Sequence, residues 1–355
     1  MVRCYGPLLG GYIHRSPENS EHFSESLVTS AHKVLASQQS ITDRIGLIGT
    51  GRNGYAAARE LFNTVPMTHL FLFNGPDTER ADKVARQLED DRHIAKIAGN
   101  KSVEIHVLGP ESLETLVEHA GIAMVTIGKA EREKSVRKRE ELFDLYLPVI
   151  ISLAERYQHY PDRNVVMVTN PVDLLSLTLH LLSENAQGQH VKVNGMNGLD
   201  PLRCRSIINE FLTIEGYTSD QISFTLTGPH NNYLVLSDAS VGGIPLEQIK
   251  FPKVRKRFRN GTTANGTGSR MLEYIVDTIK ERSRVSRELH DQYSDDRATA
   301  AVIASHVHSL VFSGDLYASM LVNLLERSNC GDIANSQLSE QLQKNFPKGM
   351  FLGWP

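Results

Sequence analysis

Cysteine is scarce in this sequence. The 355 residues include three cysteines, Cys4, Cys204 and Cys330, and no two of them form a Cys-x-x-Cys pair. An odd, widely spaced set argues against a disulfide framework and against a cysteine-rich zinc site. We therefore expect a protein of a reducing compartment, and we predict no metal site.

Long apolar runs and a strong excess of one charge are also missing. No stretch approaches the roughly 18 consecutive apolar residues of a membrane span. The formal net charge is −3, so no strong attraction to nucleic acid or to an anionic membrane is expected. The first residues make a poor signal peptide, because one Arg precedes a short Leu-Leu-Gly-Gly run and polar residues follow. These absences favour a cytoplasmic protein that binds neither nucleic acid nor a membrane.

What the sequence does contain is a regular alternation of strand-like and helix-like segments from residue 41 onward. This alternation predicts an α/β fold with a Rossmann-type, doubly wound parallel sheet. The six predicted strands are Ile45–Ile48, His69–Phe73, Val103–Val107, Ile122–Ile127, Val165–Thr169 and Val191–Val193.

The length of 355 residues is enough for two domains. We predict a Rossmann domain over residues 41–195 and an α+β domain over residues 196–355. Residues 1–40 are interpreted as an N-terminal extension or arm lying on a partner subunit, with a loosely ordered tail as the alternative. Residues 331–355 predict a short amphipathic helix and an apolar tail, either packed on the body or buried at a subunit contact.

A glycine-rich turn follows the first predicted strand. The apolar run Ile45–Ile48 ends in Gly49-x-Gly51-x-x-Gly54, and a helical stretch follows. In this arrangement Gly49 permits the turn, Gly51 lets a phosphate approach the backbone, and Gly54 lets the helix pack on the strand. The helix then points backbone N–H groups at a pyrophosphate. We predict a dinucleotide site here, with an ordinary strand–helix turn as the alternative.

Four further polar groups follow predicted strands or open the second domain. They are residues 168–173 (Val-Thr-Asn-Pro-Val-Asp), residues 199–205 (Leu-Asp-Pro-Leu-Arg-Cys-Arg), residues 228–231 (Gly-Pro-His-Asn) and Arg137 in a charged segment. Together with the glycine loop, and in this order, they resemble the lactate/malate dehydrogenase family. The resemblance covers roughly residues 42–250 and includes residues 241–246 (Val-Gly-Gly-Ile-Pro-Leu).

The resemblance implies an oxidoreductase that moves a hydride between a nicotinamide cofactor and a 2-hydroxy or 2-oxo carboxylic acid. His230 would be the general acid–base group, because an imidazole titrates near neutral pH. Asp200 would accept the other ring N–H of His230 and stabilise the imidazolium. Arg137 would polarise the substrate carbonyl when its loop closes; its alternative is an ordinary solvated charge. The family also implies a homodimer or homotetramer.

Three candidates for substrate binding lie on predicted helices or at their ends. Arg203 lies one helical turn after Asp200 and on the same face, and its guanidinium can hold a carboxylate with two hydrogen bonds. Asn170 can donate to the substrate oxygen and orient the nicotinamide ribose, although an N-cap of the following helix is the alternative. The resemblance suggests Thr299 as the small residue that faces the substrate.

The sequence departs from the family where the family selects the substrate side chain. Six residues before Arg137 stands Glu131, followed by Arg132. If Arg132 takes the role, a second carboxylate would be bound, as in malate. If Glu131 points inward, a cationic or hydroxyl-rich side chain is expected instead. Residues 229–232 also differ from the family around the histidine.

The expected cofactor is NAD(H) or NADP(H), with a slight preference for NADP(H). Asn74 stands where NAD-specific folds place an acidic residue, and Arg52 and Arg80 could neutralise a 2′-phosphate. An amide can also bond a 2′-hydroxyl, and Asp77 could reach back, so NAD(H) stays open. The cofactor-binding candidates are Gly49, Thr50, Gly51, Arg52, Asn53, Gly54, Asn74, Arg80, Thr126, Gly128 and Asn170.

Two other functions compete with the dehydrogenase. One is a non-catalytic cofactor-binding scaffold, motivated by the departures at Glu131, Asn231 and Asn232. The other is an NAD-dependent glycoside hydrolase, a related fold that uses a metal held by Cys and His. Cys204 and His230 could be proposed as its ligands, but Cys204 alternates with two arginines on its helix and should face elsewhere.

Overall fold

The computed structural model describes eleven parts of the chain. These are residues 41–92, 102–128, 139–196, 198–212, 218, 221–227, 234–249, 269–289, 296–312, 318–321 and 351–354. The predicted N-terminal arm lies outside these residues, as do the amphipathic helix and four of the candidate site residues. Those four are Glu131, Arg132, Arg137 and His230.

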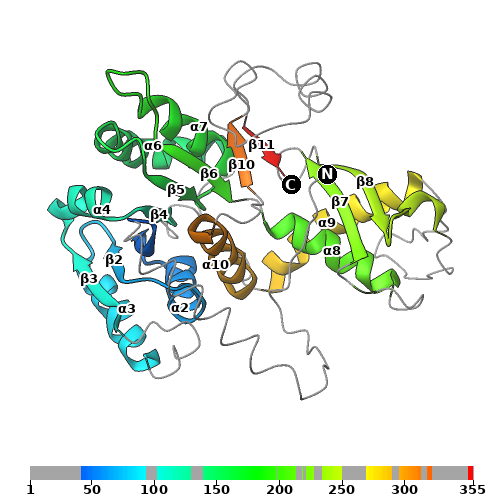
Figure 1. Ribbon diagram of the computed structural model, residues 1–355, viewed down its shortest axis with the longest axis horizontal. Coiled ribbons are helices and arrows are strands. Elements are labelled where there is room, and N and C mark those ends of the chain that lie inside the picture. The colour runs from blue at the N-terminus through cyan, green and yellow to red at the C-terminus, as the bar shows by residue number, and fades with distance from the viewer. Residues whose placement is uncertain are drawn as a thin grey trace.

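A large, mostly parallel sheet lies in the left part of the molecule as seen in Figure 1. Its parallel strands run in the spatial order β3-β2-β1-β4-β5-β6, which is the strand order of the dinucleotide-binding folds. The strands are β1 (Arg44–Ile48), β2 (His69–Phe73), β3 (Glu104–Leu108), β4 (Ile122–Val125), β5 (Asn164–Met167) and β6 (Lys192–Met196). The predicted Rossmann-type fold is therefore confirmed.

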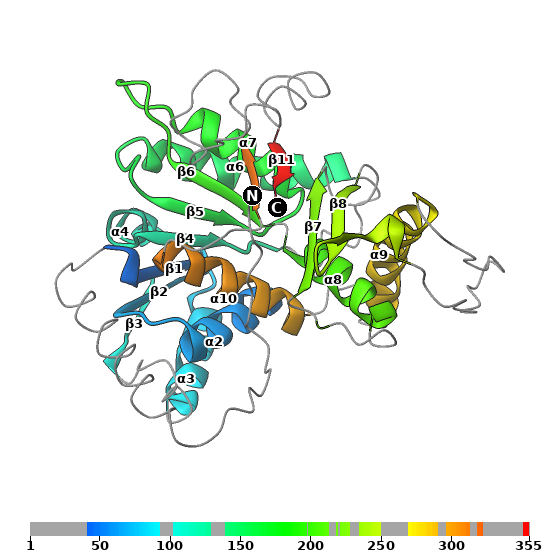
Figure 2. The same cartoon turned by 45° about the vertical axis from the view of Figure 1, so that its right-hand side comes forward.

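Helices cover both faces of this sheet, because alternate strand residues point to opposite sides. In β2, Leu70 and Leu72 belong to one apolar core, whereas Phe71 and Phe73 belong to the other. The first core is closed by α2 (Arg52–Thr64), α3 (Thr78–Asp91) and α10 (Asp296–Phe312). The second is closed by α4 (Leu113–His119), α6 (Arg139–Tyr157) and α7 (Val172–Leu182). Figure 2 shows α10 beside α2 on one side of the sheet.

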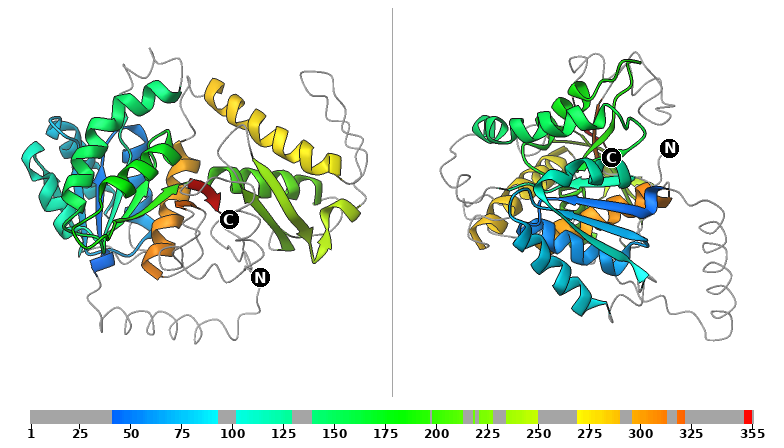
Figure 3. Two further views of the ribbon diagram at one scale, coloured as in Figure 1. Left: turned by 90° about the horizontal axis from the view of Figure 1, so that it is seen from above. Right: turned by 90° about the vertical axis from the view of Figure 1, so that its left-hand side faces the viewer.

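A second, antiparallel sheet lies beside the large one (Figure 3, left). Its strands are β7 (Ile222–Thr227), β8 (Val235–Val241) and β9 (Ile244–Pro245), and it packs with α8 (Leu199–Leu212) and α9 (Ser269–Leu289). The buried residues of these elements make a third apolar core. Short 3-10 turns occur at η1 (Ile41–Asp43), η3 (Pro110–Ser112) and η5 (Leu246–Gln248).

The end of the chain returns to the large sheet. Strand β10 (Ala318–Leu321) pairs antiparallel with β6, and β11 (Phe351–Trp354) pairs antiparallel with β10. Residues 351–354 of the predicted apolar tail thus pair with the sheet of the same chain, and their burial at a subunit contact stays a prediction. The division into residues 41–195 and 196–355 stays a prediction, yet α10, β10 and β11 lie with the large sheet.

None of the helices within the described parts of the chain is long and apolar enough to cross a membrane.

Helix α10 should contribute strongly to stability. Ile303 is fully buried in the first core. Replacing Ile303 by Ala should lower the free energy of unfolding by about 2–5 kcal/mol, since the lost apolar contacts leave a cavity. Urea unfolding followed by circular dichroism measures this change. Ser305→Ala, at an exposed position of the same helix, is the matched control and should change stability by less than about 0.5 kcal/mol. Equal stability of the two variants would contradict the packing of α10.

Candidate functional site

The glycine loop after β1 adopts a conformation that only glycine tolerates well. Gly49 has a φ of +102°, and a Cβ atom there would lie 2.8 Å from the backbone carbonyl of Thr126. Its N–H donates to the carbonyl oxygen of Phe73 at the end of β2, at 2.8 Å. The turn is therefore held between β2 and β4, at the C-terminal ends of both strands.

Helix α2 begins immediately behind this turn. A Cβ atom on Gly54 would lie 2.0 Å from the carbonyl oxygen of Gly49, so the helix approaches the loop as closely as backbones allow. By contrast, a Cβ atom on Gly51 would have no atom of the described chain within 4 Å. Gly51 is also the N-cap, and no side chain at that position caps the helix. An open backbone at a helix N-terminus fits the pyrophosphate of a dinucleotide.

Asn74 and Arg80 are tied to the same loop. The N–H of Thr50 donates to Asn74 Oδ1 at 2.8 Å, and Asn74 Nδ2 donates to the carbonyl oxygen of Asp77 at 3.2 Å. The Nε of Arg80 donates to the carbonyl oxygen of Thr50 at 3.0 Å. The Asp77 carboxylate accepts from the Arg80 backbone N–H and caps α3. The neutral amide of Asn74 and the exposed guanidinium of Arg80 thus flank the loop. This is the place where NAD-specific folds carry a carboxylate.

The end of β4 braces the loop from its other side. Thr126 Oγ1 donates to the carbonyl oxygen of Gly49 at 2.5 Å, and the hydroxyl is buried. Thr169, at the end of β5, donates to the carbonyl oxygens of Val125 and Ile127 at 3.2 and 3.1 Å. The sequence motif contained Thr169, but it was not among the candidates. Its signal is a hydroxyl residue that follows β5, the strand next to β4, as Thr126 follows β4 itself.

The other cofactor candidates lie at the same edge of the sheet. Arg52 and Asn53 form the first turn of α2, and Gly128 is exposed after β4. Asn170 is exposed after β5. Pro171, and not Asn170, is the N-cap of α7, so the alternative role of Asn170 as that N-cap is wrong.

The second half of the site begins on α8. Asp200 Oδ1 accepts from Arg203 Nη1 at 3.1 Å. The Asp200 side chain is 1% exposed and that of Arg203 is 16% exposed. A buried carboxylate is stable only when it is paired. The structure therefore brings together the two α8 residues that were predicted to share a helix face.

The neighbours of this pair on α8 have other contacts. Arg205 Nη1 donates to the carbonyl oxygen of Ile222 at 3.1 Å, and its guanidinium lies over the Phe224 ring. Cys204 is fully buried in the third core, and burial raises the pKa of its thiol to about 12. This thiol packs among the apolar side chains of the third core, whereas Asp200, one turn earlier on α8, is paired with Arg203.

Thr299 lies on the part of α10 that approaches α8. It is 3% exposed, and its hydroxyl has no hydrogen-bond partner among the described residues. One turn later, Val302 Cγ1 would lie 2.3 Å from a Cβ atom on Gly198, just before α8. The two residues of α10 share a helix face. Thr299 therefore lies on the side of α10 that meets the start of α8.

The fit between Gly54 and Gly49 can be tested by adding one methyl group. Gly54→Ala should lower the free energy of unfolding by about 1–3 kcal/mol, because no room exists for the methyl group against a backbone oxygen. Gly51→Ala is the matched control in the same loop. Its φ of −62° suits alanine, so its stability should stay within about 0.5 kcal/mol of the parent. Thermal or urea unfolding of both variants gives the comparison, and a stable Gly54→Ala protein would refute the close approach.

Known proteins resemble this chain in sequence. No protein-family model matches it. Malate dehydrogenase 1 of Aquifex aeolicus is 28% identical over 240 residues, covering 63% of this chain and 69% of that protein. An L-2-hydroxycarboxylate dehydrogenase (NAD(P)(+)) of Methanocaldococcus jannaschii is 25% identical over 211 residues, covering 58% of this chain and 64% of that protein.

Solved structures share the fold. A malate dehydrogenase from Picrophilus torridus in its apo form superposes with a TM-score of 0.64 at 20% identity, covering 87% of this chain and 84% of that chain. A lactate dehydrogenase from a Medee basin deep-sea metagenome library gives a TM-score of 0.64 at 16% identity, covering 87% of this chain and 85% of that chain. The resemblance predicted from the motifs is confirmed: in sequence the chain is similar to malate and L-2-hydroxycarboxylate dehydrogenases, and it shares the fold of malate and lactate dehydrogenases.

Proposed function

We propose that this protein is a nicotinamide-dependent dehydrogenase that interconverts a 2-hydroxy and a 2-oxo carboxylic acid. The proposal rests on two features that occur together: a glycine loop with open space beside Gly51, and a buried ion pair of Asp200 and Arg203. Relatives named malate dehydrogenase and L-2-hydroxycarboxylate dehydrogenase support the same reaction class. A bound nicotinamide cofactor would supply or accept the hydride.

In this proposal the loop and its supports hold the cofactor phosphates. The backbone N–H groups at the start of α2 would bind the pyrophosphate, because no side chain stands at Gly51. Thr126 and Asn74 keep the loop in place through their hydrogen bonds to Gly49 and Thr50. Asn170, exposed after β5, would orient the nicotinamide ribose and the substrate oxygen.

The proposed chemistry at the substrate uses two charged groups of α8. Arg203 would bind the substrate carboxylate, and its bond to Asp200 would hold the guanidinium in one orientation. Asp200 would also accept a ring N–H of His230, so that the other ring nitrogen transfers the proton. Arg137 would stabilise the charge that develops on the substrate oxygen.

The substrate side chain is the least constrained part of the proposal. Glu131 and Arg132 are two candidates for the residue that selects it. Arg132 would select an acidic substrate side chain, and Glu131 a cationic or hydroxyl-rich one. Thr299 is a third candidate, because its buried hydroxyl lacks a partner among the described residues. A polar substrate atom would satisfy that hydroxyl.

We further propose NADP(H) as the preferred cofactor, with NAD(H) also accepted. No carboxylate stands at Asn74, where it would repel a 2′-phosphate. The Arg80 guanidinium is exposed and anchored to the loop by its Nε. One relative carries the name of an NAD(P)(+)-dependent enzyme.

The proposed setting is the cytoplasm, and the proposed assembly is a homodimer or homotetramer. Exposed apolar side chains on α7, namely Leu174, Leu181 and Leu182, support self-association. The glycoside hydrolase alternative would use Cys204 as a metal ligand, but its side chain is packed in the third apolar core. The scaffold alternative differs from the dehydrogenase in predicting cofactor binding without turnover.

The reaction can be tested with one panel of substrates. NADH or NADPH oxidation should be observed with at least one 2-oxo acid among those with apolar, acidic, basic or polyhydroxylated side chains. His230→Asn should then lower kcat about 10²–10⁴-fold, since the general acid is lost, while cofactor affinity stays unchanged. His159→Asn, at an exposed position, is the control and should keep full activity. Cofactor binding without any turnover would favour the scaffold, and a fully active His230→Asn protein would refute the assigned acid.

The cofactor preference can be tested separately. Asn74→Asp keeps an acceptor for the Thr50 N–H but adds a negative charge, so KM for NADPH should rise at least about tenfold relative to NADH. Arg80→Gln should also raise KM for NADPH relative to NADH, because it removes the cation. Arg80→Lys is its control, because the charge remains and only the Nε hydrogen bond is lost. An unchanged NADPH to NADH ratio of kcat/KM in both variants would exclude this basis for selectivity.

A further inference from the structure

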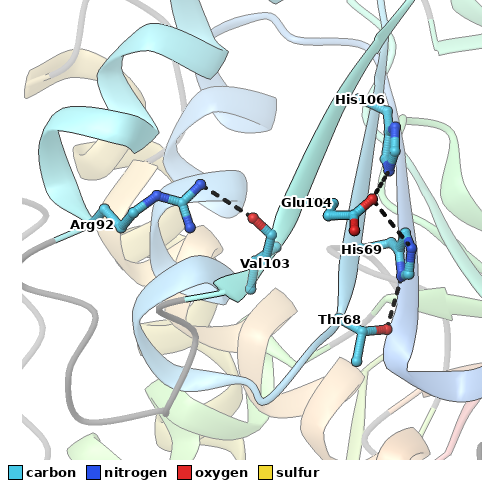
Figure 4. A network of polar contacts seen from close by, with 6 residues as sticks. All are labelled: Thr68, His69, Arg92, Val103, Glu104 and His106. Carbon is cyan, nitrogen blue, oxygen red and sulfur yellow. Dashed lines mark hydrogen bonds and ion pairs between the residues drawn. The ribbon is translucent and has the colours of Figure 1, made fainter.

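Two histidines and a glutamate meet at the edge of the large sheet, away from the glycine loop (Figure 4). His69 begins β2 and Glu104 begins β3, and these two residues are register partners. His106 follows two residues after Glu104 and therefore lies on the same face of β3. The parallel register thus fixes three potential metal ligands side by side.

The separations of their ligand atoms differ from those of hydrogen bonds. Glu104 Oε2 lies 3.7 Å from His69 Nε2 and 3.6 Å from His106 Nε2. Hydrogen bonds between nitrogen and oxygen are shorter than this. Ligands on a tetrahedral zinc ion, with bonds of about 2.0–2.2 Å, lie about 3.3–3.5 Å apart. All three ligand atoms fall within 4.8 Å of one another, so small side-chain movements would close them around one ion.

In each of the two imidazoles, one ring nitrogen is suited to binding a metal ion. His106 Nε2 is buried and has no hydrogen-bond partner among the described residues. His69 Nδ1 lies 2.9 Å from Thr68 Oγ1. When Nδ1 donates to this hydroxyl, Nε2 carries the lone pair, which is the arrangement that second-shell partners impose on metal-bound histidines.

We propose that His69, Glu104 and His106 bind one dication of the zinc class, with water completing the coordination. Two imidazoles and one carboxylate suit zinc, cobalt or nickel, whereas calcium and magnesium prefer oxygen ligands alone. In the described chain, this is the only group of three such side chains whose ligand atoms come so close together. The sequence does not predict this group, because the usual cysteine pairs are absent and the ligands come from two strands.

The His69 and His106 rings lie within 7° of parallel, so their lone pairs do not yet converge. Binding requires one ring to turn about χ2, and such terminal torsions are soft.

The site is remote from the proposed reaction and fits a structural role. His69 and Glu104 are the first residues of their strands, whereas the glycine loop lies at the opposite, C-terminal ends. Strand β3 is an edge of the large sheet. An ion shared by β2 and β3 would therefore fasten this edge strand to its neighbour.

Calorimetric titration of the untagged, full-length protein with Zn²⁺, after treatment with EDTA, tests the proposal. A one-to-one site is expected, with affinity reduced at least about tenfold in His106→Gln and in Glu104→Gln. His308→Gln, on α10, is the matched control and should bind as the parent does. Zn²⁺ at about 100 times its Kd should raise Tm by roughly 3–5 °C in the parent and in His308→Gln only.

The double variant His69→Gln/His106→Gln decides the assignment. If it binds Zn²⁺ with the affinity and stoichiometry of the parent, the ion sits elsewhere and the proposal is wrong. Absence of one-to-one binding to the parent would overturn it equally. Glu104→Gln guards against misfolding, because this side chain is largely exposed and its Tm without metal should match the parent. Co²⁺ absorption spectra of the same proteins provide a second readout, and an unchanged spectrum in Glu104→Gln would count against the carboxylate ligand.

Discussion

The contact between the turn at Gly49 and the first turn of α2 is the constraint on which the large-sheet half of the molecule depends. No side chain fits between the Gly54 backbone and the Gly49 carbonyl, so the helix starts against the end of β1. Hydrogen bonds from Thr126 and to Asn74 then fix the loop from both neighbouring strands. One close approach of two backbones thereby sets where the N-terminus of α2 points and what it can bind.

Helix α8 connects this half to the antiparallel sheet, and its sides make different contacts. Asp200 and Arg203 form a buried pair on one side. Cys204 is packed in the third core, and Arg205 bonds to β7. The same helix therefore carries a charged pair on one side, packs its apolar side in the third core, and leaves Leu202, Ser206 and Glu210 exposed. A rigid support of this kind reduces the freedom of the charged groups before any ligand arrives.

The sequence predicted those features that depend on neighbouring residues and missed those that depend on distant pairing. The run His69–Phe73 was predicted with its observed bounds, because apolar residues between turn signals are a local pattern. Asn74 was noticed for its position, yet its bond to Thr50 follows from the spatial order of β1 and β2. Strands β10 and β11 pair although they are far apart in the sequence. The proposed metal ligands on β2 and β3 are likewise brought together by strand pairing. The roles of His230 and Arg137 stay predictions.

The packing of α10 against α2 has a consequence for synthesis of the chain. The buried face of α2, with Leu61 and Phe62, shares a core with Ile303 and Val307. A ribosome adding about 5–20 residues per second needs on the order of 10–50 s to make the intervening segment. During that time the apolar face of α2 has no α10 to cover it. The core around α2 therefore becomes complete only after α10 has been synthesised.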